Sequence, residues 1–183
     1  MIRRLTFTLA LVPLFGLPAV AQQVESAYSD VDLDQCSLIH SDDFGTRWAC
    51  PGYRGFPVMI AESDLRFFVS YGFGAPEEPA AGQTLPPFNT LGPRIEWRLS
   101  NAGGGWKPFA TILRYLTERE TGEDEGQVLV VTRLEPGATC HVAYVDALAN
   151  DDANELARRA ADEQAADFDC AEAAAIVGDF TAW

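Results

Sequence analysis

The two histidines are the side chains of this 183-residue sequence best suited to move protons near neutral pH. His40 stands beside Ser41, Asp42 and Asp43, and a serine, a histidine and an aspartate together make a hydrolytic triad. No serine has the G-x-S-x-G surroundings of a nucleophile elbow, however, and adjacent residues in a turn usually face solvent. His141 follows a cysteine, where we expect a structural role. The sequence therefore predicts no catalytic residue.

Carboxylates are abundant, but their spacing predicts no metal site. Three aspartates at alternate positions begin like a calcium-binding loop: Asp30, Asp32 and Asp34. Such a loop needs a glycine and a glutamate where Gln35 and Ser41 stand. The acidic stretch 118–126 is expected to be a solvated tip, whereas a general acid needs burial to raise its carboxyl pKa. We expect no metal ion at either segment.

The glycine-rich run Gly103–Gly105 is the remaining candidate for a cofactor site. It lacks the lysine and the hydroxyl residue of a phosphate-binding loop, so it predicts a hairpin turn. The cysteines and histidines form no cluster at zinc-ligand spacing. We therefore expect no cofactor.

Three aromatic and arginine side chains are the candidates for a binding surface. Tyr53 and Arg54 lie in the unusual segment 48–57, and Trp106 follows the glycine run. Tyrosine, tryptophan and arginine are the residues most enriched at interface hot spots. Segment 48–57 also suits a rigid corner after a disulfide, and both interpretations stay open.

The four cysteines predict two disulfides. A turn within 41–45 would place Cys36 opposite Cys50. A strand over 140–148 and a helix over 151–168 each span roughly 26 Å, so a helix running back along the strand returns Cys170 to Cys140. The expected pairs are therefore Cys36–Cys50 and Cys140–Cys170.

The N-terminus has the three parts of a signal peptide. Arg3 and Arg4 precede an apolar run over 5–17, and Ala19-Val20-Ala21 is a small-x-small cleavage site before Gln22. The run is shorter than the roughly 20 residues of a membrane span. We expect cleavage of residues 1–21 and a single acidic globular domain over 22–183, periplasmic or secreted, with no membrane span after cleavage. The paired arginines leave general and twin-arginine export both open.

The formal net charge of −14 limits the partners. Such a surface repels nucleic-acid phosphates and anionic lipids, so neither is an expected ligand. A basic protein or an envelope component fits this charge better.

The elements that would position these residues are mainly short strands. The pattern favours strands at 31–36, 47–50, 57–60, 65–71, 95–99, 109–116, 128–134 and 140–148. Residues 22–30 are expected to be a polar lead-in and 72–94 a proline-rich loop. The helix over 151–168 would have Asn150 as its N-cap. The predicted class is α+β, an antiparallel sheet, sandwich-like in one version, with one C-terminal helix packed on it.

The chain resembles a group of small uncharacterised exported proteins of Gram-negative bacteria. The resemblance rests on Cys36, segment 48–57, Asp64-Leu65-Arg66, Glu96-Trp97-Arg98 and Cys140. It implies a periplasmic location and a single domain, and it implies no activity.

These observations favour a non-enzymatic exported domain that binds a protein or an envelope component. One version is an inhibitor of a cell-wall lytic enzyme such as lysozyme, because many lysozymes are basic. An envelope hydrolase is the alternative from another class. It predicts a pocket that joins a histidine to a carboxylate and a nucleophile.

Overall fold

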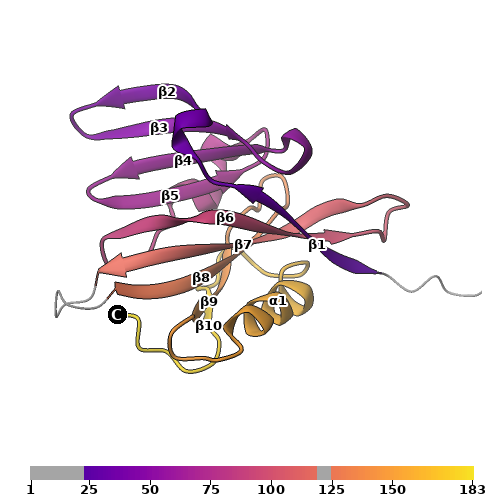
Figure 1. The fold of residues 1–183 in the computed structure, drawn as a ribbon. Helices are drawn as coiled ribbons and strands as arrows, with labels where there is room; N and C mark the ends of the chain where they lie inside the picture. Colours follow the sequence, from indigo (N-terminus) through magenta and orange to yellow (C-terminus); the bar gives the residue numbers. More distant parts are fainter. Residues whose placement is uncertain (1–22, 119–124) are drawn as a thin grey trace, which may run out of the picture.

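The computed structural model describes residues 23–118 and 125–183, so the predicted signal peptide lies outside the described residues (Figure 1). The strands are β1 (Val24–Asp30), β2 (Ser37–Asp42), β3 (Gly45–Pro51), β4 (Pro57–Ser63), β5 (Arg66–Tyr71), β6 (Asn89–Ser100), β7 (Lys107–Glu118), β8 (Glu125–Arg133), β9 (His141–Asp146) and β10 (Ala175–Ile176). The helix α1 spans Ala153–Gln164, and four short 3-10 turns are Leu33–Gln35, Tyr53–Gly55, Ala75–Glu77 and Pro79–Gly82. None of the helices in these described ranges is long and apolar enough to cross a membrane.

The strands form two sheets. The larger has the order β1-β6-β7-β8-β9-β10, antiparallel except for the parallel pair β9–β10. The smaller is an antiparallel meander, β2-β3-β4-β5. The predicted α+β class with one C-terminal helix is therefore confirmed.

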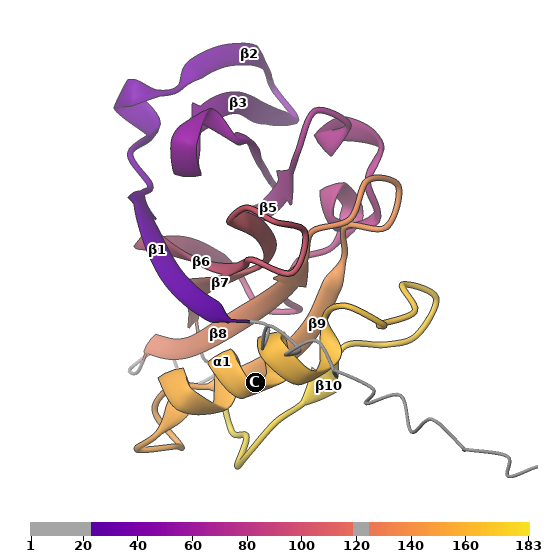
Figure 2. The same cartoon turned by 90° about the vertical axis from the view of Figure 1, so that its right-hand side faces the viewer.

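The molecule has three layers, with the four-stranded sheet on one side of the six-stranded sheet and α1 on the other (Figure 2). Strand β6 shows how the sequence sets this up. Ile95, Trp97 and Leu99 alternate toward the four-stranded sheet and are almost fully buried. Glu96 and Arg98 alternate toward α1. One strand thus supplies an apolar face to one layer and a charged face to the other.

The helix presents small side chains to the sheet. Ala157, Ala160 and Ala161 are buried against β7, β8 and β9, and alanines allow the helix to approach the sheet closely. The prediction that Asn150 caps the helix is wrong. The Asn150 amide instead donates to the carbonyl oxygens of Asp146 (2.9 Å) and Asp179 (2.7 Å), which fastens the C-terminal tail.

Three segment predictions need correction. Residues 24–30 are not a lead-in but β1, which pairs with β6 from Arg94 to Ser100. Residues 31–36 hold a 3-10 turn instead of a strand, and the strand begins at Ser37. The 72–94 loop ends earlier, because β6 begins at Asn89. Residues 24–30 were missed as a strand because they are polar, and their backbone hydrogen bonds are made with β6, some seventy residues away in the sequence.

Both predicted disulfides are present. Cys36 and Cys50 are bonded with their Cα atoms 4.4 Å apart, and Cys140 and Cys170 with theirs 5.8 Å apart. The first bridge joins the entry of β2 to β3, and the second joins the start of β9 to the segment after α1. The turn of the first hairpin occurs within 41–45, as predicted. The turn of the second hairpin was predicted at 61–64 but lies at Asp64 and Leu65, because β4 continues to Ser63, which pairs with Arg66.

Candidate functional site

The two histidines lie in unrelated surroundings. His40, on the exposed edge strand β2, has its Nε2 atom 3.0 Å from the Asp42 carboxylate. The Ser41 hydroxyl instead contacts that of Thr46 at 3.2 Å, so within the described residues no hydroxyl nucleophile is bonded to His40. His141 is buried, with its Nδ1 atom 2.9 Å from the Tyr144 hydroxyl. Burial lowers the pKa of His141 to about 4, so its ring is neutral at physiological pH.

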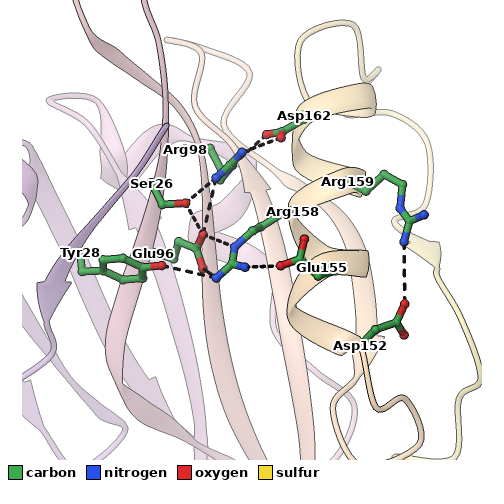
Figure 3. Close-up of polar contacts among 9 residues, drawn as sticks. All are labelled: Ser26, Tyr28, Glu96, Arg98, Asp152, Glu155, Arg158, Arg159 and Asp162. Atoms are coloured by element: carbon green, nitrogen blue, oxygen red, sulfur yellow. Dashed lines mark hydrogen bonds and ion pairs between the residues drawn. The ribbon is translucent and has the colours of Figure 1, made fainter. Parts of the chain in front are cut away.

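A cluster of charges lies between α1 and the β1–β6 edge of the large sheet (Figure 3). Arg158 donates from Nε to Glu96 at 2.7 Å, and Arg98 donates to both oxygens of Asp162, at 2.8 and 2.6 Å. The Ser26 hydroxyl donates to Glu96 at 2.5 Å and accepts from Arg98. The side chains of Glu96 and Arg98 are only 10% and 9% exposed.

This cluster can fasten the helix but offers little for chemistry. Hydrogen bonding to Glu96 raises the pKa of Arg158, so its guanidinium stays charged. Ser26 is held by a carboxylate and a guanidinium, with no imidazole among its bonded neighbours in the described chain. Each charge is matched by another, and we assign the cluster a structural role.

The end of the molecule that carries the β2–β3 and β4–β5 turns, on the left of Figure 1, has a different character. The two turns touch, since the Ser63 hydroxyl donates to the Phe44 carbonyl oxygen at 2.8 Å. Phe44 and Leu65 project from them with 84% and 62% of their surface exposed, and Phe88, just before β6, is 38% exposed. Large apolar side chains exposed together are a common mark of an interaction surface.

Carboxylates surround these apolar side chains. They are Asp42, Asp43, Glu62, Asp64 and Glu118, and the arginines at the same end are Arg47 and Arg66. We call this set of residues, with Phe44, Leu65 and Phe88, the acidic end. Its net charge is negative because five acids face two arginines.

Hydrogen bonds hold the acidic end in shape. The Asp42 carboxylate contacts His40 and accepts from the backbone N–H groups of Phe44 (2.9 Å) and Gly45 (3.1 Å), and these bonds lower the pKa of Asp42. Glu62 accepts from the N–H of Leu65 at 3.1 Å in the neighbouring turn. Phe44 and Leu65 are therefore presented on ordered turns, and order of this kind lowers the entropy lost when a surface binds a partner.

A cleft of about 460 Å³ opens at the acidic end, between the two sheets. Glu62, Leu65, Phe88 and Thr117 are among the residues that line it. The Thr117 hydroxyl is buried and has no hydrogen-bond partner among the described residues.

The predicted binding residues lie at the opposite end of the molecule. Tyr53 is half-buried with its ring 6.4 Å from that of Trp97, and Arg54 is exposed with its guanidinium 5.2 Å from the Tyr53 ring centre. Trp106 is half-buried against the same core. We call this the aromatic end. Recognition by these three residues stays a prediction.

The segment that begins like a calcium-binding loop forms a 3-10 turn. Asp32 caps the 3-10 turn by accepting from the N–H of Asp34 (3.1 Å) and the side chain of Gln35 (2.7 Å). No cluster of three metal-ligating side chains occurs within residues 23–118 and 125–183. Most of the acidic tip at 118–126 lies outside the described residues.

The sequence analysis placed Phe44 in a turn and Leu65 at the start of the predicted strand 65–71, and it missed both as functional candidates. The structure begins β5 at Arg66, which leaves Leu65 in the turn. A signal was available for Phe44, because a large apolar residue inside an otherwise polar turn cannot reach a core from that position. What the pattern could not show is that the two turns are neighbours.

The chain was compared with known proteins, and no family model, no curated protein and no solved structure matches it.

Proposed function

We propose that this protein is exported and acts as a non-enzymatic domain that binds a cationic protein through the acidic end. The observation that carries the proposal is the grouping of three exposed apolar side chains among five carboxylates at one end of the molecule, with Phe44 and Leu65 held on two ordered turns. Export is supported by the signal-like N-terminus and by the two disulfides, which are typical of oxidising compartments.

Charge and apolar surface have separate tasks in this proposal. Removal of residues 1–21, which hold two arginines and no acid, takes the net charge from −14 to −16, and this charge attracts a cationic partner over long range and speeds association. Phe44 and Leu65 then supply the apolar contact that slows dissociation. A cationic lytic enzyme such as lysozyme is the partner class that best suits an exported acidic domain, and inhibition of such an enzyme would be the consequence.

The test measures binding of the disulfide-bonded, signal-free chain to a panel of cationic lysozymes by biolayer interferometry at low and moderate salt. The double variant Phe44→Ser, Leu65→Asn should bind at least about tenfold more weakly, because two exposed apolar anchors are removed. Asparagine suits position 65, whose φ is 59°. Asp43→Asn with Asp64→Asn should slow association and flatten the salt dependence.

Phe73→Ser is the matched control, because Phe73 is 95% exposed but lies at the aromatic end. It should leave the affinity unchanged. The proposal is wrong if no lysozyme is retained at low salt, or if the Phe44 and Phe73 variants lose binding equally. A lysis assay on cell-wall suspensions then shows whether the bound lysozyme is inhibited.

A further inference from the structure

The aromatic end holds a second pocket, separate from the acidic end. It has a volume of about 590 Å³ and opens between the loop after β5, the start of β7 and the turn after β8. Its walls are mainly apolar, with Phe56, Tyr71, Phe73, Pro108, Leu134 and Pro136 among the lining residues. This volume is in the range of small-molecule sites.

The apolar wall is rigid. The rings of Phe56 and Tyr71 pack edge-on against Trp97, with centroids 5.6 and 5.7 Å from it. Trp97 is itself fully buried, and its indole N–H donates to the Ser29 hydroxyl at 2.8 Å. A wall anchored in this way keeps its shape without a ligand.

Glu78 is an acid among the residues that line the pocket, but its carboxylate is occupied by backbone hydrogen bonds. The Glu78 carboxylate accepts from the backbone N–H groups of Gly137 (2.7 Å) and Thr139 (2.9 Å), one on each oxygen. Glu78 is only 7% exposed, so its oxygens are committed to the β8–β9 turn. It therefore shapes the pocket and is poorly placed to serve a ligand.

The rim supplies an apolar flap and a cation. Phe73 is 95% exposed, so its ring is available to cover a guest. Lys107 is exposed and forms no ion pair with any described residue, and Glu135 is exposed on the same rim. An ammonium group without a partner beside an apolar pocket complements a molecule with an apolar body and an anionic head.

We propose that this pocket binds a single-chain carboxylate amphiphile, a free fatty acid, with the chain on the wall of Phe56 and Tyr71 and the carboxylate near Lys107. This inference is independent of the proposed function, which uses the other end of the molecule.

The test is fluorescence titration of the disulfide-bonded chain with a dansyl-labelled undecanoate, followed by displacement with dodecanoate. Phe73→Ser should weaken binding about tenfold, because the exposed ring no longer covers the chain. Lys107→Gln should weaken it several-fold and Glu135→Gln should strengthen it. The last two variants are on the surface and leave the fold intact, so the proposal remains testable if Phe73→Ser is poorly folded.

Phe44→Ser is the matched control and should bind the probe like the unsubstituted chain. Dodecyltrimethylammonium should displace the probe less well than dodecanoate. The inference is overturned if the chain does not bind the probe, if Phe44→Ser and Phe73→Ser weaken binding equally, or if the Lys107 and Glu135 variants do not change affinity in opposite directions. Binding only to phospholipid vesicles also overturns it.

Discussion

Arg158 offers the sharpest test of what fastens the helix to the sheet. Its guanidinium bridges Glu96 on β6, at 2.7 Å, and Glu155 on its own helix, at 2.6 Å (Figure 3). Arg158→Met keeps the aliphatic stem and the helix propensity but removes the charge. Glu96, 10% exposed, then keeps only Arg98, at 3.7 Å, and the Ser26 hydroxyl as partners.

The expected loss of stability lies between two limits. Breaking a fully buried ion pair costs about 3–5 kcal/mol, and an exposed pair contributes at most about 1 kcal/mol. The Arg158 side chain is 29% exposed, so we expect a loss of about 2 kcal/mol. For a chain of this size that corresponds to a decrease in Tm of roughly 6 °C.

Arg159→Met is the matched control on the next residue of the same helix. The Arg159 guanidinium lies 3.9 Å from Asp152, and both side chains are more than half exposed. Its replacement should change the free energy of unfolding by less than about 0.5 kcal/mol. Urea unfolding with equal m-values provides the comparison. Equal effects of the two substitutions would refute the assignment of the cluster as the helix anchor.

Two further predictions concern pH and the disulfides. Burial lowers the pKa of His141 from 6.5 to about 4, so the unfolded chain binds this proton more tightly and stability falls as pH decreases from 6.5 toward 4. His141 contributes at most about 3 kcal/mol to this pH dependence of the free energy of unfolding. Urea unfolding at pH 6.5 and pH 4 should show a smaller loss of stability for His141→Gln than for the unsubstituted chain, and equal losses would contradict the prediction. Replacing Cys140 and Cys170 by serine removes a disulfide that closes a 30-residue loop and should lower the free energy of unfolding by about 3.5 kcal/mol. Removing the Cys36–Cys50 disulfide, which closes a 14-residue loop, should lower it by about 3 kcal/mol. Hydrogen exchange should then increase across the whole chain in the first case and mainly in β2 in the second, and the reverse pattern would contradict this account.

Local patterns were enough to predict several elements. The alternation of Phe67, Val69 and Tyr71 predicted β5, and the turn residues at 41–45 placed the first hairpin. The disulfide pairing followed from matched lengths of strand and helix, because rise per residue is a fixed property of each. The helix N-cap was missed, because a side chain that suits a cap can bond the tail instead, as Asn150 does.

Other features depend on segments that are distant in the sequence. Strand β1 is polar and carries little apolar alternation, so only its partner β6 makes it a strand. Glu96 and Arg98 alternate with apolar residues along β6, a pattern typical of side chains that face solvent. The helix α1, more than fifty residues later in the sequence, covers them. Neither outcome could be inferred from local spacing.

The sequence by itself determined the cysteine pairing, the hairpins and the single helix, because each depends on short-range geometry and on the period of apolar residues. Only the tertiary structure decided which exposed side chains lie together. It brought the turns of Phe44 and Leu65 together at one end and grouped Phe56, Phe73 and Lys107 at the other. The physical reason is that strand alternation decides which face a side chain takes, whereas the packing of distant strands decides which side chains share an end.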